Sequence, residues 1–157
     1  MGDILMKSNL VVMVGPPGCG KTTFIKNQSL KGNHISRDKI RFSLLEDGET
    51  YFGKEDLVFK EYVKQIQESL DAGCRTYADA THLNEKSRDK VLNRLNLENA
   101  TLCAVNFIVP LAECIRRNDL REGRAKVPRS VIRRMHFSFV PVNITDKRFS
   151  EIINVRW

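Results

Sequence analysis

An eight-residue segment from Gly15 to Thr22, with the sequence Gly-Pro-Pro-Gly-Cys-Gly-Lys-Thr, constrains the fold of this chain more than any other feature. It follows an uninterrupted apolar run, Leu10–Val14, which has the length and composition of a strand buried on both faces. A segment that suits a helix, residues 21–29, comes directly after it. A glycine-rich turn between a buried strand and a helix predicts an α/β fold with a mostly parallel sheet.

The spacing GxxxxGK[ST] in this segment favours the binding of a nucleoside triphosphate. Glycines let the backbone fold tightly, so that successive N–H groups point at phosphate oxygens, and the start of the following helix favours an anion. In this pattern Lys21 reaches the β- and γ-phosphates and the Thr22 hydroxyl binds Mg²⁺. We therefore predict ATP or GTP with Mg²⁺ as cofactors. The residues expected to bind the nucleotide are Gly15, Gly18, Cys19, Gly20, Lys21, Thr22 and Thr23.

Cys19 occupies a variable position of the loop, and the simplest interpretation is that its side chain only fills space. The alternative hypothesis is that the start of the helix favours the thiolate of Cys19 and makes it reactive. Bound ATP would then protect Cys19 from a thiol reagent.

The rest of the chain alternates strands with helices, which predicts a parallel sheet covered by helices on both faces. Without an internal repeat or a Pro/Gly linker, residues 1–157 are expected to form a single domain. Further strands are expected at residues 33–35, 75–78, 102–109 and 151–155. Further helices are expected at residues 39–45, 55–72, 85–97, 111–120 and 128–139.

Asp38 and Arg41 follow the second expected strand, so they should lie at the same edge of the sheet as the phosphate loop. Their spacing of three places both on one face of a helix. A carboxylate there can accept the proton of an attacking hydroxyl, and a guanidinium can hold a phosphoryl group. An aspartate at a helix start is equally often a helix cap, and the spacing alone does not separate the two interpretations.

Two further groups of charged residues belong to this hypothesis. Asp79 comes just after the third expected strand, where a carboxylate can position Mg²⁺ or its water. Arg117 and Arg121 are four residues apart and share a helix face in the basic segment 115–128. A lid at about residues 111–127 that closes on a triphosphate would bring these arginines to the reacting group and exclude water. The alternative is a solvated basic face, the commoner fate of charge runs.

The composition is that of a water-soluble protein with a basic bias. The chain has 157 residues and a formal net charge of +7, which favours polyanionic partners such as nucleic acid. The first ten residues lack a signal sequence, and no apolar run is long enough to cross a membrane, so we expect a cytoplasmic protein. Its four cysteines and three histidines are scattered and show no metal-ligand spacing.

Together these segments resemble the kinase domain of polynucleotide 5′-kinases, the end-healing enzymes of phages and bacteria. This group lies within the P-loop kinases that also include zeta-toxin-like proteins. The resemblance covers nearly the whole chain. Residues 15–22 match the phosphate loop, residues 36–41 the general-base segment, residues 79–81 the family's Asp-Ala-Thr-Asn, and residues 127–128 the Val-Pro after the lid.

The resemblance implies Asp38 as the general base, Arg41 as a contact of the reacting phosphate, and Arg117 and Arg121 as the lid arginines. His82 stands where the family usually has asparagine. The implied reaction is γ-phosphoryl transfer from ATP to a hydroxyl, with the 5′-OH end of DNA or RNA as the first choice of acceptor.

Two alternatives remain open at this point. In the first, the chain is a kinase whose acceptor is the hydroxyl of a small molecule such as a nucleoside, sugar or nucleotide-sugar. In the second, the chain is a non-catalytic ATP-binding switch. The sequence leaves open the choice of DNA or RNA, of ATP or GTP, the oligomeric state, and the role of the basic residues 129–134.

Overall fold

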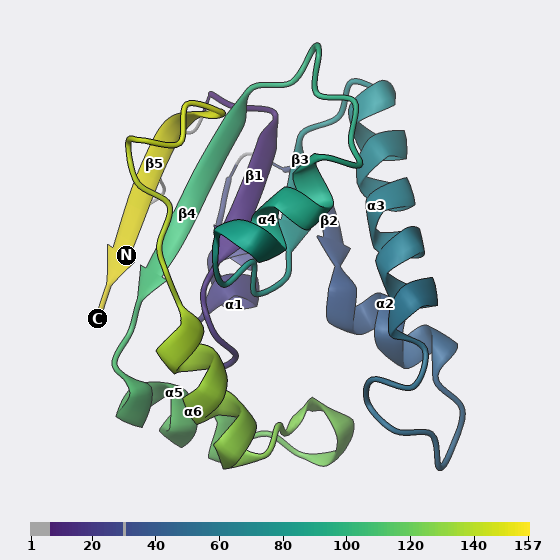
Figure 1. Ribbon diagram of the computed structural model, residues 1–157, viewed down its shortest axis with the longest axis vertical. Coiled ribbons are helices and arrows are strands. Elements are labelled where there is room, and N and C mark those ends of the chain that lie inside the picture. The colour runs from purple at the N-terminus through teal and green to yellow at the C-terminus, as the bar shows by residue number, and fades with distance from the viewer. Residues whose placement is uncertain (1–6, 30) are drawn as a thin grey trace.

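Five strands form one sheet in which the described residues pair only in parallel, in the order β2-β3-β1-β4-β5 (Figure 1). The computed structural model describes residues 7–29 and 31–157. The strands are β1 (Leu10–Val14), β2 (Asn33–Ser36), β3 (Thr76–Asp79), β4 (Leu102–Ile108) and β5 (Phe149–Arg156). The predicted parallel sheet is confirmed, and the strand that leads into the glycine-rich loop lies at its centre.

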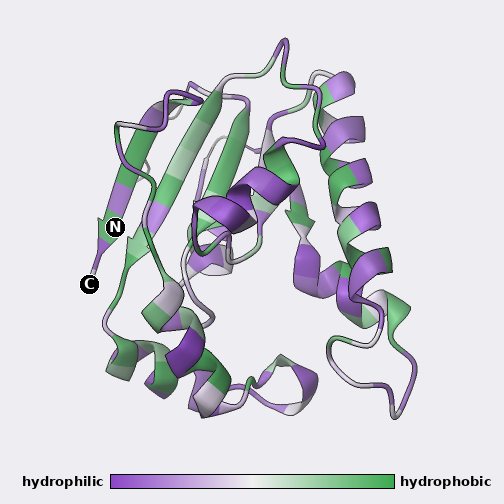
Figure 2. Ribbon diagram, in the orientation of Figure 1, coloured by the Kyte–Doolittle hydropathy of each residue, from purple (hydrophilic) through white to green (hydrophobic). Residues whose placement is uncertain are grey.

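Helices cover both faces of the sheet, as the sequence predicts. Side chains alternate along a strand, so Leu10, Val12 and Val14 face one side of the sheet while Val11 and Met13 face the other. Figure 1 shows α4 in front of the sheet and α1 behind it, and Figure 2 shows β1 as hydrophobic along its length. The first face packs with α2 (Arg37–Leu44), α3 (Glu55–Asp71) and α4 (Glu85–Leu92), the second with α1 (Lys21–Lys26), α5 (Leu111–Asp119) and α6 (Arg129–Ser138).

Two helices end three or more residues earlier than the apolar spacing predicts. Helix α1 ends at Lys26 rather than residue 29, and α4 ends at Leu92 rather than residue 97. After α4 the backbone turns with short-range hydrogen bonds, and Leu95 still packs against the core from this turn. A turn therefore buries the apolar residue that the spacing assigns to the helix. Asn93 and Asn96 in this segment have low helix propensity, which is consistent with the early end of α4.

The carboxyl ends of β1, β2 and β3 meet at one edge of the sheet. Ser36 of β2 lies opposite Asp79 of β3, and Val12 of β1 lies opposite Ala78. The glycine-rich loop, the start of α2 and Asp79 therefore leave the sheet side by side, which is where parallel α/β sheets bind ligands.

The described residues contain no helix that is both long enough and apolar enough to cross a membrane. The expectation that the first ten residues lack a signal sequence rests partly on residues 1–6, which lie outside the described residues.

Candidate functional site

The glycine-rich loop runs from the end of β1 into α1 (Figure 1). The Lys21 ammonium donates hydrogen bonds to the carbonyl oxygens of Gly15 at 2.9 Å and Pro16 at 3.0 Å. These bonds hold the cation over the loop. A tight loop with a lysine over it and a helix start behind it suits the phosphates of a nucleotide.

Two glycines allow this loop to approach α5. Gly18 has a φ of 82°, and a Cβ atom at this position would lie 2.6 Å from the carbonyl oxygen of Cys114. A Cβ atom at Gly20 would lie 3.1 Å from Nη1 of Arg117. Arg117 donates to Glu113 at 2.9 Å, and hydrogen bonds from the two arginines that bind Glu113 lower its pKa to about 2. The ionised carboxylate thus holds Arg117 beside the phosphate loop.

Cys19 points away from the open side of the loop. Its side chain is 2% exposed and belongs to the core cluster that contains Phe107. The Lys21 ammonium lies 3.5 Å from its sulfur. This position suits the space-filling interpretation, while the reactivity of Cys19 stays a hypothesis that burial of the thiol argues against.

Thr22 and Asp79, the residues predicted to hold Mg²⁺, contact each other. The Thr22 hydroxyl donates to Oδ2 of Asp79 at 2.9 Å, and Nε2 of His34 lies 2.7 Å from the same oxygen. Burial acts to raise the pKa of Asp79, but the hydrogen bonds from His34 and Thr22 and the charge of Lys21 outweigh it and lower the pKa. An ionised carboxylate beside a hydroxyl is a donor set that Mg²⁺ prefers, so these residues fit the ion.

His34 is a neighbour of this pair that no local sequence pattern marks as a site residue. Strands β2 and β3 pair with Ser36 opposite Asp79, so His34, two residues before Ser36, lies on the same face of the sheet. The alternation of side chains was visible in the sequence. The pairing of β2 with β3, which brings His34 to Asp79, cannot be predicted from a local sequence pattern.

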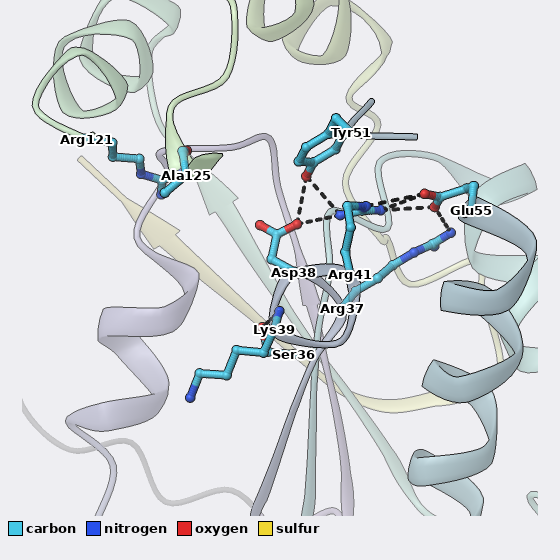
Figure 3. Close-up of polar contacts among 9 residues, drawn as sticks. All are labelled: Ser36, Arg37, Asp38, Lys39, Arg41, Tyr51, Glu55, Arg121 and Ala125. Carbon is cyan, nitrogen blue, oxygen red and sulfur yellow. Dashed lines mark hydrogen bonds and ion pairs between the residues drawn. The ribbon is translucent and has the colours of Figure 1, made fainter. Parts of the chain in front are cut away.

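Asp38 and Arg41 lie in a cluster of polar side chains with Tyr51, Glu55 and Arg37, which also donates to Glu55 (Figure 3). Arg41, only 5% exposed, forms an ion pair with Asp38 and a bidentate pair with Glu55. The Tyr51 hydroxyl lies 2.7 Å from Oδ1 of Asp38 and 2.8 Å from Nη1 of Arg41. The sequence places Asp38 and Arg41 on one helix face, but it gives no sign of Tyr51 or Glu55, because the loop after α2 brings them back to this helix.

The cap of α2 is Ser36, whose hydroxyl accepts a hydrogen bond from the backbone N–H of Lys39 at 3.2 Å. The Asp38 carboxylate is directed at side chains instead. The alternative interpretation of Asp38 as the cap of this helix is therefore wrong, although Asp38 still lies in the first turn, where its charge is favourable.

One cavity of about 570 Å³ joins the phosphate loop to the Asp38 cluster. Tyr51 and Glu55 line it together with Arg124 and Lys126 of the basic segment. The predicted site residues that line it are Gly18, Gly20, Lys21, Thr22, Thr23, Asp38, Arg41, Asp79 and Arg121. Gly15, Cys19 and Arg117 are not among its lining residues.

The segment after α5 lies across this cavity from α2. Arg121 donates to the carbonyl oxygen of Ala125 in its own loop at 3.5 Å. Arg124 donates to the carbonyl oxygens of Leu45 and Glu46, which follow α2. The basic segment therefore contacts the opposite wall of the cavity, and its function as a lid stays a prediction.

Comparisons with known proteins support the fold. The family model described as an AAA domain matches residues 10–142. The structure is similar to a sugar kinase from Janibacter sp., with a TM-score of 0.64 and 20% identity over 94% of this chain and 84% of that chain. It is also similar to Kti12 from Chaetomium thermophilum in complex with ADP-AlF3, with a TM-score of 0.68 and 14% identity over 94% and 89% of the two chains.

A third similar structure is a chain of the Pnkp1/Rnl/Hen1 RNA repair complex, with a TM-score of 0.67 and 24% identity. The match covers 82% of the chain described here but only 43% of that chain. A comparison with curated protein sequences found no match. At these identities the likenesses show the fold alone, and that fold is the α/β P-loop kinase fold expected from the sequence.

Proposed function

This chain belongs to the AAA domain family, and on that premise we propose that it transfers the γ-phosphoryl group of ATP to a hydroxyl acceptor. The observation that carries the proposal is that one cavity is lined both by the loop residues Lys21 and Thr22 and by the Asp38 carboxylate. A protein that only bound a nucleotide would have no need of a base on the opposite wall of the same cavity.

The proposed roles follow from positions around the cavity. Asp38 accepts the proton of the acceptor hydroxyl while the oxygen of that hydroxyl forms a bond to the γ-phosphorus. The bond between the γ-phosphorus and the β,γ-bridging oxygen breaks, and ADP is released. Lys21 and Arg121 neutralise the charge of the transferring group, and Arg117 supports them from beside the loop. Thr22 and Asp79 would hold Mg²⁺, which when bound neutralises charge on the β- and γ-phosphates.

For the acceptor we propose the 5′-OH end of DNA or RNA. The segments that resemble polynucleotide kinases, the net charge of +7 and the fold shared with a chain of an RNA repair complex support this choice. A small-molecule hydroxyl is the second candidate. It is favoured by Arg124, which reaches across the cavity to Leu45 and Glu46 and narrows the space for a polymer.

The test is transfer of label from γ-labelled ATP in the presence of Mg²⁺. The acceptors are DNA and RNA oligonucleotides with a 5′-OH, the same oligonucleotides with a 5′-phosphate as the matched control, and a panel of nucleosides and sugars. We expect label on the 5′-OH oligonucleotides and none on their phosphorylated controls. Label only on a small molecule would rule out the 5′-OH end as acceptor and identify that small molecule as the acceptor instead. ATP binding without transfer to any acceptor would contradict the proposal and favour a non-catalytic switch.

A further inference from the structure

The loop between α2 and α3, residues 45–54, returns a tyrosine to the first turn of α2. The loop is closed at its base, because the Lys54 ammonium donates to the carbonyl oxygen of Leu44 at 2.8 Å and pairs with Glu49 at 3.1 Å. Tyr51 lies within this closed loop. Its hydroxyl therefore reaches Asp38 from outside the helix that carries Asp38.

The direction of each hydrogen bond at the Tyr51 hydroxyl follows from its partners. A guanidinium can only donate, so the hydroxyl oxygen accepts from Nη1 of Arg41. The single hydroxyl proton is then donated to Oδ1 of Asp38 at 2.7 Å. Burial, together with the negative charge of Asp38, raises the pKa of Tyr51, so the phenol remains a donor at ordinary pH.

The Tyr51 ring is fixed on several sides. The Arg41 guanidinium lies over it at 4.3 Å from the ring centroid. Phe52 meets it edge to face with centroids 4.7 Å apart, and Phe42 does so at 6.1 Å. Arg41 is itself held by Glu55. The tyrosine hydroxyl and the arginine are thus both held in place by groups other than Asp38.

Both donors act on the same oxygen of Asp38, because Nη1 of Arg41 also contacts Oδ1. In the described part of the chain, Oδ2 of Asp38 has no hydrogen-bond donor. Figure 3 shows this second oxygen pointing away from Tyr51 and Arg41, on the side of Asp38 where Arg121 lies. The carboxylate is therefore held by one oxygen while the other is open to a hydroxyl in the cavity.

We propose that Tyr51 is a positioning residue that holds Oδ1 of Asp38 and thereby directs Oδ2 at the acceptor hydroxyl. The inference rests on the proposed function, since it needs Asp38 to act as the base. It assigns the loop 45–54 a part in catalysis that is exerted through Asp38.

The test is the substitution Tyr51→Phe, which keeps the ring and removes the hydroxyl. Losing one hydrogen bond to a charged group should lower kcat for transfer about 10- to 100-fold. The KM for ATP should stay within about twofold, because both hydrogen bonds of the Tyr51 hydroxyl go to Asp38 and Arg41 and not to the phosphate loop. Tyr62→Phe is the matched control, since its hydroxyl contacts His82 in the core, and it should leave kcat unchanged.

A double-mutant cycle separates positioning from a general structural effect. If Tyr51 acts through Asp38, Tyr51→Phe should have no further effect on transfer in the Asp38→Asn background. Thermal unfolding of Tyr51→Phe by circular dichroism checks that the variant is folded.

Three outcomes would overturn the inference. An unchanged kcat in Tyr51→Phe would overturn it while the proposed function stands, and so would a multiplicative loss in the double variant. Transfer to no acceptor by the wild-type protein would remove the proposed function, and with it the base that Tyr51 positions.

Discussion

His82 and Tyr62 form a buried hydrogen-bonded pair next to β1. Nδ1 of His82 donates to the carbonyl oxygen of Met13 at 2.6 Å, so Nε2 carries no proton and accepts from the Tyr62 hydroxyl at 3.1 Å. Burial lowers the pKa of His82 from 6.5 to about 4, against the opposing effect of the bond to Met13. The imidazole is therefore neutral in the folded protein.

This neutral histidine makes stability depend on pH. Above pH 6.5 both the folded and the unfolded states hold His82 neutral, so its contribution is complete. As the pH falls from 6.5 to about 4, only the unfolded state takes up the proton, and the free energy of unfolding should drop by about 3 kcal/mol. His82→Asn should lack this drop, because asparagine does not titrate and tolerates the φ of 42° found here.

The measurement is denaturant unfolding of the wild-type protein and of His82→Asn between pH 7.5 and pH 4. Other titrating groups are common to both proteins, so the difference between the two curves isolates His82. The two curves should diverge below pH 6.5. Curves that stay parallel over this range would contradict the assignment.

At the scale of single residues, the sequence predicts those parts of the site that lie within one local segment. Lys21 and Thr22 belong to one loop and Asp38 and Arg41 to one helical turn, so spacing places each pair. His34, Tyr51 and Glu55 reach the site through strand pairing or through the closure of a ten-residue loop. Those contacts depend on tertiary structure, which a local sequence pattern does not predict.

Among the elements, the contact between the phosphate loop and α5 decides the position of the loop. It passes through Gly18, which has no room for a side chain against the backbone of Cys114. Gly48 has nearly the same φ, 84° against 82°, but among the described residues no atom beyond its two chain neighbours lies within 4 Å of a Cβ atom built there. Alanine substitutions at the two glycines therefore distinguish two costs in the free energy of unfolding. One is the cost of the left-handed backbone conformation, which both share, and the other is the cost of the close contact, which only Gly18 has.

Gly48→Ala should lower the free energy of unfolding by about 1 to 2 kcal/mol, the cost of a side chain in the left-handed conformation. Gly18→Ala should lower it by about 2 to 5 kcal/mol, since crowding against α5 adds to the same cost. Only Gly18→Ala should also weaken ATP binding, because it displaces the loop. Denaturant unfolding and ATP titration check this, and equal losses in the two variants would contradict the close contact.

The order and type of the elements follow from periodicity and from glycine, while some of their ends do not. Gly73, with a φ of 73°, follows α3 where the sequence predicts a stop. Leu95 continues the apolar spacing of α4, yet it lies in a turn after the helix. A side chain is buried when it points toward the core, and a turn can orient it that way as well as a helix can. Apolar spacing therefore locates a helix more securely than it locates the end of that helix.

For the whole molecule, the parallel sheet explains how distant segments come to share one cavity. The carboxyl ends of β1, β2 and β3 supply Lys21, Asp38 and Asp79, and the segment after β4 supplies Arg121. Alternating strands and helices predict this edge, but they do not give the strand order or the 570 Å³ between the walls. We propose that this one cavity holds both the nucleotide and the base.

The most direct test of that claim measures ATP affinity and single-turnover γ-phosphoryl transfer in the same three proteins: wild type, Lys21→Ala and Asp38→Asn. We expect Asp38→Asn to bind ATP as tightly as wild type but to transfer the phosphoryl group at least about 100-fold more slowly. Lys21→Ala should lose both ATP affinity and transfer. Transfer at the wild-type rate by Asp38→Asn would contradict the proposed role of Asp38, because the cavity would then support transfer without the base on its second wall.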